Sequence, residues 1–429
     1  MTSPDLPTPE LPTPEPPTPE RLTVTGPEDI LGFIPHSLGY WPADSLVAMT
    51  MQGKRLGATL RVDLPVLDTE AGLSRFSSTV RDYLEADHDA DGTLLVLFSN
   101  DGWIDRTGPA PGSVPAAAAA AGPLGRLLAA LEIELESSGR PVRDAWFVGD
   151  DFWRNAYCFD QSCCPLPGRS VDEIRDSRLN AEMVFRGSSV GEDPSSAANA
   201  SPVTAPADAA VLASEHRWAG EFAALRGSRS QFARIMDVWD CVLAAEPEGT
   251  LPAGLAGYLR ASLRIPHWRD AVLVMSAAGR TAAEQGAEEF GIFEPDAGLP
   301  VVSPLLDGLP AAGPEDDAAY PVPGYGEVLL GLAPRSPRWE RMRALERVLQ
   351  QLGAAGGGEG GAAALTGRGW IEWCRGRGSF AHALLERAAA EHPGYRLAEL
   401  LSEVVSRGTL CGWAGRRDAA WQKFETDAA

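Results

Sequence analysis

The first half of the chain alternates between two hydrophobic periods. At 71–87 and at 124–138, apolar residues recur at every third or fourth position, which is typical of a helix that buries one face. Short apolar runs typical of buried strands lie at 45–51, 56–62, 93–98, 142–148, 153–159 and 181–185. Because helices alternate with strands, the pattern predicts an α/β layered domain over residues 22–190.

Two local signals define the start of this domain. Thr25, an early proline and Glu28 have the spacing of a helix N-terminus, so we expect a short helix from there to Pro35. Residues 52–54 resemble a turn between the first two strand runs, and this predicts a β-hairpin.

The second half of the chain has only the helical period. It predicts an all-α region in two parts, 209–289 and 338–412, on either side of a Pro- and Gly-rich insertion at 290–337. Residues 191–208 are rich in Ser, Ala and Pro without periodicity, which is typical of a linker. The Gly run 353–361 lacks the Gly-Lys-Ser/Thr ending of a phosphate-binding loop, so we expect a flexible spacer there. The individual helices are expected at 209–225, 231–245, 255–263, 268–278 and 339–352.

The part 338–412 ends in a pattern similar to a tetratricopeptide helix hairpin. Small Ala381 and Ala388 allow neighbouring helices to approach, and Pro393 separates two helical stretches. One such unit is visible, whereas a stable array needs about three. Two interpretations stay open, a groove for a protein partner on the C-terminal helices and plain helix packing.

Both ends of the chain are predicted to be tails. Residues 6–20 repeat the unit Leu-Pro-Thr-Pro-Glu with one change, and prolines at this density favour an extended backbone with no apolar face. We therefore expect residues 1–21 to be disordered, as a solvated spacer or as a ligand for a proline-binding groove. Residues 413–429 are expected to form a short C-terminal tail.

Charge and cysteine content exclude several classes of protein. The chain has 37 Lys and Arg against 59 Asp and Glu, a formal net charge of -22, which disfavours binding to nucleic acid or to anionic membranes. No apolar run reaches the roughly 18 residues that span a bilayer, and the N-terminus lacks a secretory signal pattern. Six cysteines in 429 residues do not make a disulfide framework. These features predict a cytoplasmic protein.

The segment 153–168 is the strongest candidate for a chemically active site. Its three cysteines, Cys158, Cys163 and Cys164, fall within seven positions. Thiolates are soft ligands, so three sulfurs together with Asp160 or a distant histidine suit zinc. The gap between the first two cysteines is unlike a standard zinc knuckle, and adjacent cysteines do not easily point at one metal ion.

Two other interpretations of these cysteines remain open. Arg154 and Arg169 lie nearby in the sequence, and positive charge lowers the pKa of a thiol and favours redox reactivity. Alternatively, the cysteines are small apolar residues buried beside a Pro-Gly turn. No cofactor is predicted from the motifs, and zinc at the cysteines is the one metal considered.

Further candidate binding residues are Asp44, Asp63, Trp153 and Arg154. The expected layer places them near strand ends, where open sheets usually bind ligands. The chain contains no Gly-x-Ser-x-Gly or His-Glu-x-x-His motif, and its six histidines lack ligand spacing. Whether the protein is an enzyme is therefore left open.

Several motifs together resemble an actinobacterial protein family. They are Asp-Ile-Leu at 29–31, Pro-His-Ser-Leu-Gly-Tyr-Trp-Pro-Ala-Asp-Ser-Leu-Val at 35–47, Arg-Val-Asp-Leu-Pro at 61–65, the cysteine segment 153–168 and the C-terminal stretch 378–401. The family they resemble is the domain-of-unknown-function family numbered 4192, and the resemblance covers residue 22 to about residue 408. It implies a high-G+C actinobacterial host and no established activity. Residues 300–323 and the Gly run look like local insertions.

Two functional hypotheses follow. The first is a cytosolic binding or scaffolding protein, which the helix hairpin, the Pro-rich tail and the missing catalytic motifs favour. The second is an enzyme or a small-ligand or metal-binding domain with its site near the cysteine segment 153–168.

Overall fold

The chain divides into two compact units, with the division between Val190 and Gly191. The computed structural model describes residues 24–65, 69–100, 122–158, 160–194, 208–245, 249–294, 300–306, 321–416 and 418–421. The predicted N-terminal tail and most of the predicted linker 191–208 lie outside these residues. We call residues 24–190 the sheet unit and residues 191–421 the helical unit.

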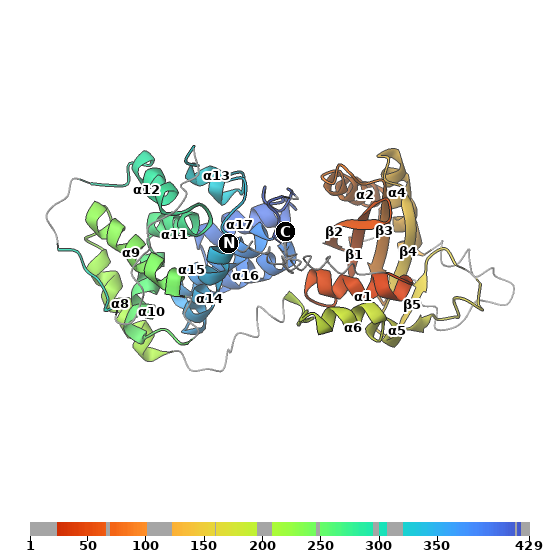
Figure 1. Ribbon diagram of the computed structural model, residues 1–429, viewed down its shortest axis with the longest axis horizontal. Helices are drawn as coiled ribbons and strands as arrows, with labels where there is room; N and C mark the ends of the chain where they lie inside the picture. Colours follow the sequence, from red (N-terminus) through yellow and green to blue (C-terminus); the bar gives the residue numbers. More distant parts are fainter. Residues whose placement is uncertain are drawn as a thin grey trace, which may run out of the picture. The chain divides into compact units, whose positions relative to one another are not determined.

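The sheet unit is built on one six-stranded mixed sheet with the order β2-β1-β3-β4-β5-β6 (Figure 1). The strands are β1 (Ser45–Gln52), β2 (Arg55–Asp63), β3 (Gly92–Phe98), β4 (Val142–Val148), β5 (Phe152–Asn155) and β6 (Arg169–Ser170). Only β3 and β4 pair in parallel, and the chain between them contains the helix α4 (Pro123–Ser137). The other neighbours pair antiparallel, and β1 and β2 form the predicted hairpin.

Helices cover both faces of this sheet, as Figure 1 shows. On one face, α2 (Glu70–Leu84) and α4 pack over alternate strand residues such as Leu46 and Leu95. On the other face, α1 (Pro27–Leu38) packs over the intervening residues such as Val47, with α5 (Asp172–Arg175) and α6 (Arg178–Phe185) beside it. Because successive strand residues point to opposite faces, the continuous apolar runs supply both cores. The predicted α/β layer is confirmed.

Helix α1 is anchored by two buried polar residues. The Asp29 carboxylate accepts hydrogen bonds from the N–H and hydroxyl of Thr25 and from the N–H of Leu179, on α6. The His36 ring lies 2.8 Å from the Ser188 hydroxyl and 2.7 Å from the Asn180 side-chain oxygen. The helix runs through Pro35, the predicted end, and stops at Leu38.

Two strand predictions near the end of the sheet unit differ from the structure. The run 181–185 is not a strand but part of α6, where Ser177 caps the N-terminus by accepting from the N–H of Asn180. The buried residues of α6 are Leu179 and Met183, four positions apart, so helical burial explains the short apolar run equally well. The run 153–159 is a strand only to Asn155, whose side-chain oxygen accepts from the N–H of Tyr157 and turns the chain.

Helices form the second unit, around a single apolar core. They are α8 (Ala209–Phe222), α9 (Arg229–Ala245), α10 (Ala253–Leu263), α11 (Pro266–Ala278), α12 (Arg280–Glu289), α13 (Tyr325–Leu329), α14 (Trp339–Ala354), α15 (Gly358–Cys374), α16 (Gly378–Glu391) and α17 (Arg396–Ser406). The predicted all-α character is confirmed. Among the described residues, no helix is both long and apolar enough to cross a membrane.

The prediction of a flexible spacer at 353–361 is wrong. Helix α15 begins at Gly358, and Gly360 and Gly361 are buried. A Cβ atom at Gly360 would lie 2.6 Å from the Glu215 carboxylate, and one at Gly361 would lie 2.6 Å from the Gly356 carbonyl oxygen. The glycines are therefore required for close packing and not for flexibility.

The C-terminal helices match the predicted hairpin in outline. Helix α16 contacts both α15 and α17, and its Ala381 and Ala388 are fully buried at these contacts. Whether these helices form a tetratricopeptide-like array stays a prediction. Beyond α17, Trp413 is fully buried, and its indole N–H donates to the Pro334 carbonyl at 2.9 Å.

Candidate metal centre

The three clustered cysteines lie in the loop 156–168, between β5 and β6. The two strands pair antiparallel, Trp153 beside Arg169, so both ends of the loop are held together at the edge of the sheet. Gly168 is needed for this close approach, because a Cβ atom there would lie 2.7 Å from the Trp153 carbonyl oxygen. The pairing therefore brings the two ends of a long loop together.

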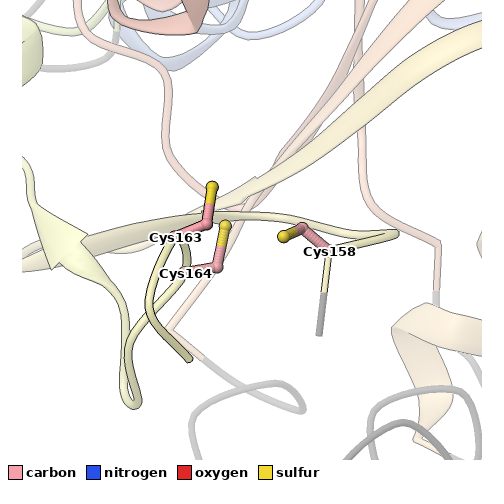
Figure 2. Close-up of side chains that lie close together, drawn as sticks. All are labelled: Cys158, Cys163 and Cys164. Atoms are coloured by element: carbon pink, nitrogen blue, oxygen red, sulfur yellow. The ribbon is translucent and has the colours of Figure 1, made fainter. Parts of the chain in front are cut away.

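The sulfur atoms of Cys158, Cys163 and Cys164 all lie within 4.8 Å of one another. In Figure 2, the sulfur of Cys158 is directed toward that of Cys164. Cys163 is exposed, Cys158 is half-buried and Cys164 is buried. Among the residues that the structure describes, this is the one group of at least three His, Cys, Asp or Glu side chains close enough to hold a metal ion.

A tight turn allows the two adjacent cysteines to reach the first one. The Asp160 carbonyl accepts from the N–H of Cys163 at 3.1 Å and from the N–H of Cys164 at 2.7 Å. The Asp160 carboxylate accepts from the N–H and hydroxyl of Ser162 and holds the same turn from its side chain. The turn therefore allows adjacent cysteines to approach one site, which the sequence made difficult to expect. Asp160 stabilises this turn.

The thiols have unequal acidities. The pKa of Cys158 is lowered, first by the N–H of Asp160, which donates to its sulfur, and then by the thiols of Cys164 and Cys163. Burial raises the pKa of Cys164 to about 11, together with its hydrogen bond to Cys158. The N–H of Asn155 donates to the Cys164 sulfur and acts in the opposite direction. Backbone N–H groups therefore face two of the three sulfurs.

The two arginines that one interpretation assigned to thiol activation make other contacts. Arg154 is buried, and its guanidinium donates to the Cys158 carbonyl at 3.2 Å. Arg169 lies 4.8 Å from the centre of the Trp153 ring and pairs with Glu173 at 2.5 Å. The lowered pKa of Cys158 has the hydrogen bonds to its sulfur as its main cause.

The other predicted binding residues do not join the cysteines. Asp63 is paired with Arg61 at 2.7 Å and its side chain is 80% exposed, while Asp44 is exposed just before β1. Strand register places Ser45 and Asp63 in one row with Phe98, Val148 and Trp153, at the end of the strands where β5 begins. Cys158 follows the other end of β5, so the aspartates and the cysteines lie at opposite ends of the strands. Trp153 is buried in the core beneath α1.

Sequence reasoning missed Asn155 as a supporting residue of the loop. Its side-chain oxygen accepts from the N–H of Cys158 at 3.0 Å, and its side-chain amide donates to Asp144 at 2.6 Å. An Asn at the end of a strand and just before a turn is the signal that points to such a role. Tyr157, the next residue but one, donates its phenol proton to Glu132 on α4, which fixes the loop to that helix.

A family model described as Domain of unknown function (DUF4192) matches residues 27–287 and 338–410, which is most of the chain. The chain belongs to this family. The matched region of this DUF4192 member includes the whole cysteine loop and ends one residue before Cys411, and it leaves out residues 288–337. No match was found among curated proteins or among solved structures.

Proposed function

We propose that the sheet unit of this DUF4192 protein binds a soft metal ion, zinc in the first place, through Cys158, Cys163 and Cys164. The observation that carries the proposal is the gathering of three sulfurs within 4.8 Å in one loop. Sulfurs that share a tetrahedral zinc ion lie roughly 3.8 Å apart, because each Zn–S bond is about 2.3 Å long. Small side-chain rotations are enough to reach that spacing.

Exposure favours ligation over simple packing. A cysteine that serves as a small apolar residue is normally buried, but here Cys163 is exposed and Cys158 is half-buried. The N–H groups of Asp160 and Asn155, which donate to two of the sulfurs, stabilise negative charge on sulfur and so favour the thiolate form that a metal ion needs. These groups also orient the ligands before the ion binds.

Three protein ligands leave one coordination position for a molecule from outside the protein. Structural zinc sites normally have four protein ligands, whereas sites that exchange water or substrate keep an open position. We infer that the proposed centre is of this second kind. Because thiolate ligands require reduced cysteines, the proposal includes the predicted cytoplasmic location.

The test is metal analysis of the full chain purified without a His-tag. We expect close to one equivalent of zinc per chain, and intense sulfur-to-metal charge-transfer absorption after exchange with Co²⁺. Cys163→Ser removes an exposed ligand and should lower the zinc content at least tenfold at equal free zinc, whereas Cys241→Ala removes a cysteine of the helical unit and should leave it unchanged. A folded wild-type chain that takes up no zinc or Co²⁺ would refute the proposal.

The C-terminal helices support a second proposal, a protein-binding role. Helix α17 has only Ala398 fully buried, while Leu400 is 42% exposed and Leu397 and Leu401 are half-buried. An amphipathic helix at the end of a helical array, with a partly uncovered apolar stripe, is a surface that a partner helix can cover. Leu400→Glu should abolish capture of a partner from the native host without changing the melting temperature, and equal capture by both proteins would contradict the proposal.

A further inference from the structure

Arg154, on β5, is a buried cation without an anionic partner among the residues that the structure describes. It is only 6% exposed, and within the described residues its guanidinium makes one hydrogen bond, to the Cys158 carbonyl at 3.2 Å. Two further arginines are comparably buried, Arg260 and Arg269, and they have carboxylates at 2.6 Å and 2.8 Å. Because burying an uncompensated charge is costly, Arg154 requires a source of negative charge nearby.

The hydrogen bond of Arg154 fixes its guanidinium beside the cysteine loop. Its acceptor is the carbonyl of Cys158, a proposed metal ligand, so only the length of one residue separates the cation from a ligand sulfur. The next residue, Asn155, accepts from the N–H of the same cysteine at 3.0 Å. Two adjacent strand residues therefore hold both backbone groups of one ligand, next to the place where the three sulfurs meet.

The proposed metal centre carries the charge that Arg154 lacks. A divalent ion held by three thiolates has one net negative charge, and a water molecule in the open coordination position leaves that charge unchanged. One guanidinium compensates it fully. Asp160 is the one acidic residue in the sequence of the loop 156–168, but it is exposed and accepts from the N–H and hydroxyl of Ser162.

We propose that Arg154 is the counter-ion of the metal centre, a positioning residue whose positive charge stabilises the ion together with its three thiolates. This role rests on the proposed zinc function and adds to it a residue that is not a ligand. The effect is mutual, because a loaded centre removes the cost of burying Arg154. The ion and the cation therefore stabilise each other within the sheet unit.

The test measures the zinc affinity of three variants of the full chain by competition with a chromophoric chelator, at one pH and one ionic strength. Arg154→Gln keeps a donor for the Cys158 carbonyl without the charge, and Arg154→Lys keeps the charge. Arg169→Gln is the matched control, because Arg169 already pairs with Glu173 at 2.5 Å. We expect Arg154→Gln to bind zinc roughly 10- to 100-fold more weakly than the wild type, and the other two to stay within about threefold of it.

Urea unfolding of the same proteins, with and without zinc, separates charge compensation from a merely structural role. A side chain that only holds the loop in place would stabilise the chain equally in both states. We expect Arg154→Gln to lower the urea midpoint of the zinc-loaded sheet unit. In the metal-free chain the same substitution removes an uncompensated buried charge, so the midpoint should be unchanged or higher.

Contrary results distinguish this role from the proposed function itself. If Arg154→Gln and the wild type bind zinc equally well, the counter-ion role is overturned and the zinc function stands. If the Lys variant is weakened as much as the Gln variant, or if Arg154→Gln loses equal stability with and without zinc, Arg154 has a structural role only. A folded wild-type chain that takes up neither zinc nor Co²⁺ refutes the metal function and the counter-ion role together.

Discussion

A buried ion pair in the helical unit allows a quantitative prediction. Arg260, on α10, has no exposed surface, and its guanidinium pairs with Glu215 on α8 at 2.6 Å. Three further guanidinium N–H groups donate to the carbonyls of Leu352, of Gly356 at 2.9 Å and of Gly357 at 2.7 Å. Glu215 is the carboxylate that compensates this charge, and its side chain is only 9% exposed.

Glu215→Gln keeps the shape of the side chain and removes its charge. Breaking a buried pair while the other charge stays buried costs about 3–5 kcal/mol, and because Gln still offers an oxygen we expect about 3 kcal/mol. The matched control is Glu359→Gln. It breaks the pair of Arg264 and Glu359 at 2.9 Å, in which both side chains are about one third exposed, and should cost about 0–1 kcal/mol.

The assay is urea unfolding of the full chain followed by tryptophan fluorescence, since most of the tryptophans lie in the helical unit. The loss of about 3 kcal/mol should appear as a lower urea midpoint for that unit, and as a fall in its melting temperature of roughly 6–12 °C. If Glu215→Gln and Glu359→Gln lower the free energy of unfolding by the same amount, the assignment of Glu215 as the compensating charge is refuted.

Two further predictions concern the sheet unit. Gly57→Ala should lower the free energy of unfolding by about 1–3 kcal/mol in urea titration, because a Cβ atom there would overlap the Thr50 hydroxyl and lie 2.5 Å from the Asp87 carboxylate; an alanine at Gly220, where nothing lies within 4 Å, should cause no loss. Burial acts to raise the pKa of Asp29, but its hydrogen bonds lower it more, so that its pKa lies below 3.8. Its stabilisation is therefore complete above about pH 4 and is lost as the pH falls further. Asp29→Asn should cost more stability at pH 7 than at pH 3, and an equal loss at both would contradict this.

The layered half of the fold was predictable because its signals are local. The apolar runs at 45–51 and 93–98 are continuous, as expected for strands covered on both faces, and the period of α2 and α4 shows one buried side. The run 181–185 does not distinguish a strand from a helix, because a segment of only five residues, most of them apolar, fits both the strand period and the helical period. The helix cap at Ser177 decides in favour of a helix, but a cap is a weaker signal in the sequence than the hydrophobic pattern.

The candidate centre was predictable in its ligands and not in its geometry. Spacing alone identified Cys158, Cys163 and Cys164 as possible donors, but whether three sulfurs meet depends on the turn that the Asp160 carbonyl makes. The burial of Arg154 without a carboxylate partner among the described residues was not predictable at all, since it depends on where the acidic side chains of the sheet unit lie. Such a feature depends on the packing of the whole unit.

The glycines near the start of α15 have a practical consequence for engineering the protein. Composition makes residues 353–361 look like the natural place to insert a tag, a protease site or a fluorescent domain. An insertion there would pull the carbonyls of Gly356 and Gly357 away from Arg260 and would remove two of the four hydrogen bonds that hold this cation. The segment 353–361, whose composition suggests a flexible spacer, is therefore among the segments of the chain that tolerate an insertion least.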